Sequence, residues 1–97
     1  MVRHSESIIS DLKQCYLCAT TVNLHRHHIY FGNPGRKLSE KYGCWVWLCQ
    51  AHHTGNNGVH HCKGLDVLLK RTCQVAAMRH YNWSVEDFRH VFGKNYI

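Results

Sequence analysis

No apolar run in this sequence of 97 residues approaches the roughly 18 residues that a membrane-spanning helix needs. No apolar stretch typical of a secretory signal peptide occurs in the first residues, MVRHSESIISDLK. We therefore expect no membrane partner, no export and a cytoplasmic location. Acidic residues are also scarce, because 6 Asp and Glu stand against 12 Lys and Arg and give a net charge of +6. A small basic domain favours polyanions, nucleic acid first, although solubility alone would also explain the charge.

Proline occurs once, and neither a repeat nor a linker is visible, so we expect a single domain over residues 1–97. A core of this size supplies only about 3–5 kcal/mol, and small domains often add a disulfide or a metal. The sequence contains 6 Cys and 10 His, and it shows no export signal. Thiols stay reduced in a cytosol, and imidazole and thiolate are the usual zinc ligands. A metal is therefore favoured over disulfides, which would require a secreted protein.

The order of expected elements indicates an α+β fold. Residues 7–13 allow a short helix or a strand, and residues 32–43, with three Gly and the Pro, predict a loop. The remaining elements are extended segments at 23–31 and 44–48, a short helix after Cys49, a helix at 65–80 with apolar residues at helical spacing, and a terminal helix at 85–92. Ser84 and Asp87 form a capping box before that last helix, and Gly93 would end it.

Two pairs of metal-ligand residues share the spacing of a zinc site. Cys15 and Cys18 are separated by two residues, and so are Cys49 and His52. Two such pairs can supply four ligands to one tetrahedral zinc ion, and the binding of that ion would be coupled to folding. The alternative is a set of buried free cysteines beside a surface histidine. The other cysteines are interpreted as packed thiols: Cys44, Cys62 and Cys73.

Three further motifs carry a resemblance to a known family. HRHHIYFG, YGCWVWLC and QAHH, in this order, resemble the HNH nucleases, the ββα-metal family. The resemblance covers residues 15–61 and implies a zinc-stapled ββα core, with a helical tail at about 63–97. The FGKNY ending is similar to that of small phage-encoded HNH proteins.

The resemblance also implies roles for three histidines. The second member of the pair that closes the first strand is the general base, here His28. The member before it, His27, and the histidine after the last zinc ligand, His53, would hold a catalytic divalent ion such as magnesium, manganese, nickel or zinc. The middle Asn of the family motif is missing, because Gly43 and Cys44 occupy its place, and Asn33 is the nearest substitute.

Other candidates follow from position in the sequence. Asn57 and His60 lie four and seven residues after His53, so a continued helix would bring both toward the metal. His25 and His61 are expected to be exposed or to support the ligands. The 32–43 segment offers plausible phosphate contacts, or else a solvated basic loop, with Arg36, Lys37 and Lys41. Trp45 and Trp47 are interpreted as core residues rather than as base-stacking platforms.

The chemistry of these residues suits phosphodiester hydrolysis. That reaction needs a base near neutral pH, and an unperturbed histidine has a pKa of about 6.5. It also needs a cation against the charge on the phosphate and the leaving oxygen. We therefore predict a metal-dependent DNA endonuclease that leaves 5′-phosphate and 3′-hydroxyl ends, as the family implies. The alternative is a zinc-stapled nucleic-acid-binding module without catalysis.

Overall fold

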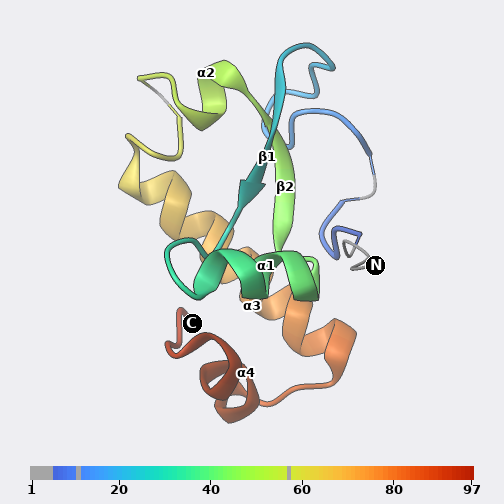
Figure 1. Cartoon of the computed structure of the whole chain (residues 1–97), viewed down its shortest axis with the longest axis vertical. Helices are drawn as coiled ribbons and strands as arrows, with labels where there is room; N and C mark the ends of the chain where they lie inside the picture. Colours follow the sequence, from blue (N-terminus) through green and yellow to red (C-terminus); the bar gives the residue numbers. More distant parts are fainter. Residues whose placement is uncertain (1–5, 11, 57) are drawn as a thin grey trace.

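A two-stranded sheet and four helices make up the part of the chain that the computed structural model describes, residues 6–10, 12–56 and 58–97 (Figure 1). In chain order the elements are β1 Leu24–His28, α1 Gly35–Tyr42, β2 Trp45–Cys49, α2 Gln50–His53, α3 Lys63–Tyr81 and α4 Val85–Phe92. The expected α+β class is confirmed. None of the described helices combines the length and apolar character required to cross a bilayer.

The sheet pairs β1 and β2 in antiparallel register, with Leu24 opposite Cys49 and His28 opposite Trp45. Successive side chains of a strand point to opposite faces, so this register gives the sheet two distinct surfaces. The face toward α3, termed the inner face, carries His25, His27, Val46 and Leu48, and the outer face carries Arg26, His28, Trp45 and Trp47. Each member of the His27–His28 pair therefore belongs to a different face.

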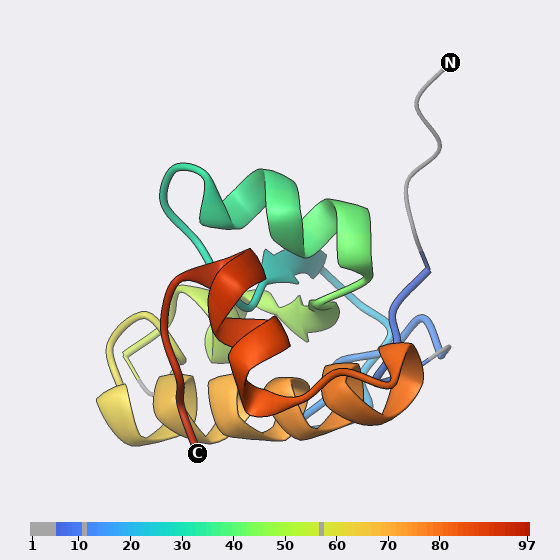
Figure 2. The ribbon, with the colours of Figure 1, turned by 90° about the horizontal axis from the view of Figure 1, so that it is seen from below.

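The core lies between the inner face and the long helix α3. Figure 2 shows α1 and α3 on opposite sides of the strands, with α4 between the two helices. Buried apolar residues from β2 and the residue before it, from α3 and α4, and from the segment after β1 include Ile29, Cys44, Val46, Leu48, Leu69, Cys73, Ala77 and Phe88. Beyond the strand ends, Tyr30 packs against α4 with ring centroids 5.5 Å from Phe88 and 4.5 Å from Phe92. The tail thus completes a core that the two strands alone could not supply.

Helix α1 corrects the prediction of a loop over residues 32–43. Ser39 is completely buried, where its hydroxyl donates to the Tyr30 carbonyl at 2.7 Å and accepts from the Tyr30 amide at 3.0 Å. Gly43 ends the helix at φ 73°, with its N–H on the Ser39 carbonyl. Proline before a helix and glycine after it are ordinary boundary signals. The glycines and the proline therefore mark the ends of a helix rather than a loop.

The structure confirms the two helices predicted at 65–80 and 85–92. α3 extends the expected 65–80 helix by a few residues, and α4 has the predicted bounds. The capping box is present, because the Asp87 amide donates to Ser84 Oγ at 3.1 Å and the Ser84 amide donates to Asp87 Oδ2 at 2.9 Å. Gly93 ends α4 in the left-handed region. The described residues of the 7–13 segment form neither helix nor strand, and Ser7 Oγ donates to the Trp45 carbonyl at 2.6 Å.

Candidate metal centres

Four predicted zinc ligands come together at one end of the sheet. The ligand atoms of Cys15, Cys18, Cys49 and His52 all lie within 4.8 Å of one another. His52 Nδ1 is 3.3 Å from Cys49 Sγ and 3.6 Å from Cys15 Sγ, and Cys18 Sγ is 3.8 Å from Cys49 Sγ. Zinc bond lengths of about 2.3 Å to sulfur and 2.0–2.1 Å to nitrogen place tetrahedral ligand atoms about 3.5–3.8 Å apart. The cluster therefore fits a structural metal such as zinc.

Backbone hydrogen bonds form the turn that presents the first two cysteines. The Ala19 amide donates to the Cys15 carbonyl at 2.7 Å, and the Cys15 amide donates to the Thr20 carbonyl at 2.8 Å. Ala19 takes a left-handed conformation at φ 64°, which closes the turn. The Tyr16 amide donates to the Trp47 carbonyl at 2.8 Å, so the turn is fastened to β2, the strand that ends at Cys49.

The environment of Cys15 favours the thiolate that a metal requires. Burial raises the pKa of this thiol, but hydrogen bonds from the backbone of Cys49, Leu17 and Cys18 outweigh burial and lower it to about 6. A thiolate is the form that binds zinc, so the turn prepares a ligand before any ion arrives.

A second cluster, of histidines only, lies on the inner face. The ligand atoms of His27, His53 and His60 lie within 4.8 Å of one another, and His53 Nε2 is 3.0 Å from His60 Nε2. His27 is only 2% exposed, and its Nε2 has no hydrogen-bond partner among the described residues. An unsatisfied buried polar atom costs about 1–3 kcal/mol. A metal ion held by the three imidazoles would satisfy this atom, so the residues present fit such an ion.

The protonation of these imidazoles agrees with a ligand role. Burial and the neighbouring His53 and His60 lower the pKa of His27 to about 3. Burial also lowers the pKa of His53, with further contributions from His60 and His25. Neutral imidazole is the form that coordinates metals. His25 supports the cluster from the next inner-face position of β1, because its Nδ1 lies 3.0 Å from His53 Nδ1.

Adjacent residues of α2 serve the two clusters. His52 turns to the cysteines, and His53 turns to the inner-face histidines. The helix ends at His53, so His60 does not arrive by two further helical turns as the spacing predicts. It arrives through a turn in which the Val59 amide donates to the His52 carbonyl at 2.9 Å. Asn57 lies outside the described residues.

The predicted general base belongs to a different group of side chains. His28 Nε2 lies 3.1 Å from Glu40 Oε1 of α1, and both Glu40 oxygens accept from Arg26 Nη1 at 2.8 Å. Burial raises the pKa of Glu40, but these hydrogen bonds outweigh it and lower the pKa. Arg26 also lies 3.8 Å above the Trp45 ring. Sequence reasoning missed Glu40 because its segment was expected to be a loop.

The remaining predicted residues lie outside both clusters. Arg36 and Lys37 are exposed on α1, Lys41 is exposed in its last turn, and Asn33 is exposed just before the helix. His61 is exposed, as expected. Trp45 is buried and Trp47 half-buried, which agrees with a packing role. Among the other cysteines, Cys44 and Cys73 are buried and Cys62 is half-buried.

Comparisons with models of protein families, with curated proteins and with solved structures found no match. The resemblance to HNH nucleases therefore depends on the sequence motifs, and the two clusters are described from their own geometry.

The cysteine cluster generates a prediction on folding. Cys49→Ala should remove tightly bound zinc and unfold the domain or greatly lower its Tm, because metal binding and folding are coupled. Elemental analysis and thermal melting of protein purified without chelator measure both effects. Cys62→Ala is the matched control, since this half-buried cysteine is not among the clustered ligands, and it should retain the metal. Wild-type protein without tightly held zinc would contradict the prediction.

Proposed function

We propose that this protein is a metal-dependent DNA endonuclease with the active site at the histidine cluster. The observation that carries the proposal is the convergence of His27, His53 and His60 around a buried nitrogen without a partner among the described residues. This cluster is separate from the cysteine site, so one ion can stabilise the fold while another takes part in catalysis. Sites that act on substrates keep a coordination position open, and three protein ligands leave one.

The donor set narrows the choice of catalytic ion. Three imidazoles suit zinc, nickel and related transition metals, whereas magnesium prefers oxygen ligands. An ion bound there would supply Lewis-acid stabilisation of the phosphate and of the leaving 3′-oxygen. The chain's own contribution is to bring three imidazoles together. Burial keeps two of them, His27 and His53, neutral by lowering their pKa, and His53 follows the cysteine-site ligand His52 on α2. Of these three, His60 is the exposed one, so the cluster opens to solvent on that side.

In this proposal His28 takes the proton from the attacking water. The Glu40 carboxylate accepts from His28 Nε2–H, which leaves Nδ1 as the nitrogen with a free electron pair. Glu40 itself is held by Arg26, so the imidazole has a fixed orientation. His28 is the last residue of β1, so the proposal requires a phosphate at the strand end to contact both this outer-face base and the inner-face ligands. The products would be 5′-phosphate and 3′-hydroxyl ends.

A non-catalytic nucleic-acid-binding module is the second candidate. One specific observation favours it: the predicted base and the histidine cluster lie on opposite faces of β1. The missing motif Asn at Gly43 and Cys44 points the same way. Both candidates share the basic surface and the cysteine site, so cleavage itself separates them.

The catalytic roles predict different behaviour for two variants. His28→Ala should lower plasmid nicking by about 10²–10⁴-fold while zinc content, fold and DNA affinity stay nearly intact, because a general base contacts water rather than a metal. His53→Ala should also abolish nicking, but through loss of the catalytic ion. Higher ion concentration should partly restore His53→Ala and leave His28→Ala inactive. Nicking of chelator-washed protein with a panel of divalent ions measures these effects.

The matched control for both variants is His90→Ala, an exposed histidine of α4, which should nick at the wild-type rate. If His28→Ala nicks at the wild-type rate while His27→Ala is inactive, then His27 is the general base and His28 is not. Failure of the wild type to cut with any ion, combined with retained DNA binding, would establish the binding module instead.

The exposed cations of α1 predict an electrostatic contribution. Arg36 and Lys37 changed together to Ala should weaken DNA binding similarly for all sequences. They should also make the salt dependence of affinity shallower by up to about 2 units of slope, because phosphate contacts release counterions. A control with the same change in charge is Arg79→Ala with Arg89→Ala, on α3 and α4. If the two double variants weaken DNA binding equally, the cations of α1 contribute only through the net charge of the protein and not through contacts at α1.

A further inference from the structure

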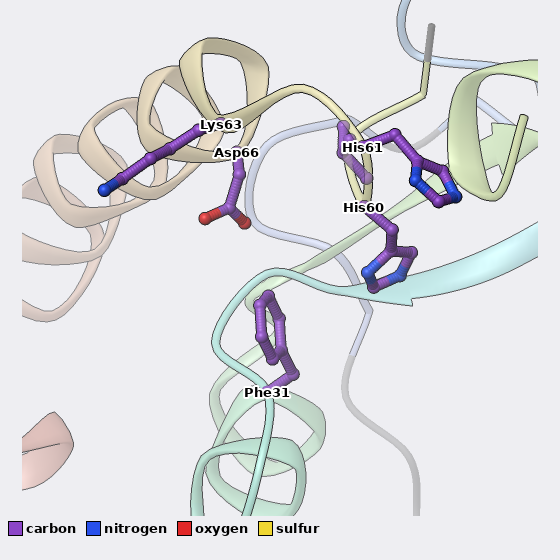
Figure 3. A pocket seen from close by; sticks show the side chains of 6 residues that line it. Phe31, His60, His61, Lys63 and Asp66 are labelled. Carbon is purple, nitrogen blue, oxygen red and sulfur yellow. The ribbon is translucent and has the colours of Figure 1, made fainter. Parts of the chain in front are cut away.

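A cleft adjoins the histidine cluster on the side of α3. It has a volume of about 540 Å³, and the residues that line it come from three segments: Phe31, Val59, His60, His61, Lys63 and Asp66 (Figure 3). His60 belongs both to this cleft and to the metal-ligand cluster. Whatever occupies the cleft therefore lies directly beside the proposed ion.

An aromatic ring is exposed on the wall of this cleft. Phe31 follows β1 by three residues and is 50% exposed, although Ile29 and Tyr30 directly before it are buried. Its ring centroid lies 5.7 Å from that of His60 and 6.4 Å from that of His27. The half-exposed ring is thus open to contact with a group that enters the cleft.

The charges around the ring suit a nucleotide. Lys70 Nζ lies 4.3 Å from the Phe31 ring centroid and 2.9 Å from Asp66 Oδ2. The acidic group in the cleft is thereby compensated, and it does not oppose an approaching phosphate with an unbalanced charge. Lys63 adds an exposed cation at the first position of α3. The lining of the cleft thus combines an aromatic ring, two imidazoles and one ammonium group, which are typical of sites for bases and phosphates.

We propose that this cleft holds an unpaired DNA base next to the cleaved phosphate, with Phe31 as its stacking platform. The inference rests on the proposed function, because the phosphate is placed by the histidine cluster. Bases inside a duplex are stacked on both faces by their neighbours, so a ring in the wall of a cleft can meet only a base that has left the stack. The preferred substrates are then single-stranded DNA or duplexes with an unpaired nucleotide.

The experiment measures the affinity of a labelled single-stranded oligonucleotide and of its duplex by fluorescence anisotropy, without added divalent ions. Phe31→Ala should weaken single-strand binding by about 5- to 150-fold and leave duplex affinity within about twofold of wild type, the range expected for loss of one stacked base. Phe31→Trp should retain binding, because an indole also stacks. Leu68→Ala, an equally exposed apolar residue of α3 that does not line the cleft, should have no effect.

A series of oligonucleotides with one abasic position each identifies the contact itself. One abasic position should weaken binding to the wild type and cause no further loss with Phe31→Ala, since the stacked pair is already broken. Equal losses for both proteins at every position would overturn the inference. So would equal weakening of single-strand and duplex binding by Phe31→Ala when melting shows that the variant is folded.

The same measurements separate this inference from the proposed function. Wild-type nicking together with single-strand binding that ignores Phe31 would overturn the stacking role and leave the nuclease standing. If single-strand binding depends on Phe31 but the wild-type protein fails to cut with every ion tested, the nuclease proposal is overturned and a base-binding cleft is supported.

Discussion

The convergence of Cys15, Cys18, Cys49 and His52 ties three separate segments of the chain together at one end of the sheet. It joins an N-terminal turn, the last residue of β2 and the third residue of α2. A sheet of two five-residue strands is marginal by itself. A metal at this point would fix the end of β2 and the direction of α2, and with them the position of His53. The second cluster would then be a consequence of the first.

Alternation along β1 separates the chemistry of the two faces. His25 and His27 point toward α2 and the turn that carries His60, whereas Arg26 and His28 point toward Glu40 of α1. Adjacent residues of one strand therefore enter a metal-ligand cluster and a charged hydrogen-bond network. The proposed reaction requires both groups to reach one phosphate at the end of β1.

Residue spacing could predict the parts of the fold that local rules determine. The long helix α3, the capping box before α4 and the ligands of the cysteine cluster follow from apolar periodicity, from capping chemistry and from paired spacing. The register of β1 with β2 was not predicted, because strand pairing depends on which face meets α3. The position of His60 also needed the structure, since a turn rather than a helix brings it to His53.

Helix α1 shows why one part of the site was missed. Glycine and proline near residues 32–35 indicated a loop. The contact that stabilises the helix is tertiary: the buried side chain of Ser39 forms hydrogen bonds with the backbone of Tyr30. With that segment expected to be a loop, Glu40 had no predicted partner. Proline at the start and Gly43 at the end were the available signals for a helix. The exposure of Phe31 likewise became visible only after the core had been assembled.

Titration of metal-free protein with Co²⁺, followed by absorption spectroscopy, tests the central claim that two separate metal sites differ in their ligands. Two binding phases are expected. One should show the intense thiolate-to-cobalt charge-transfer bands of a site with three cysteines, and the other only the weak ligand-field bands of a site of imidazoles. His27→Ala should remove the second phase alone. A single phase, or thiolate bands in both phases, would show that the protein does not hold two separate metal sites with different ligands.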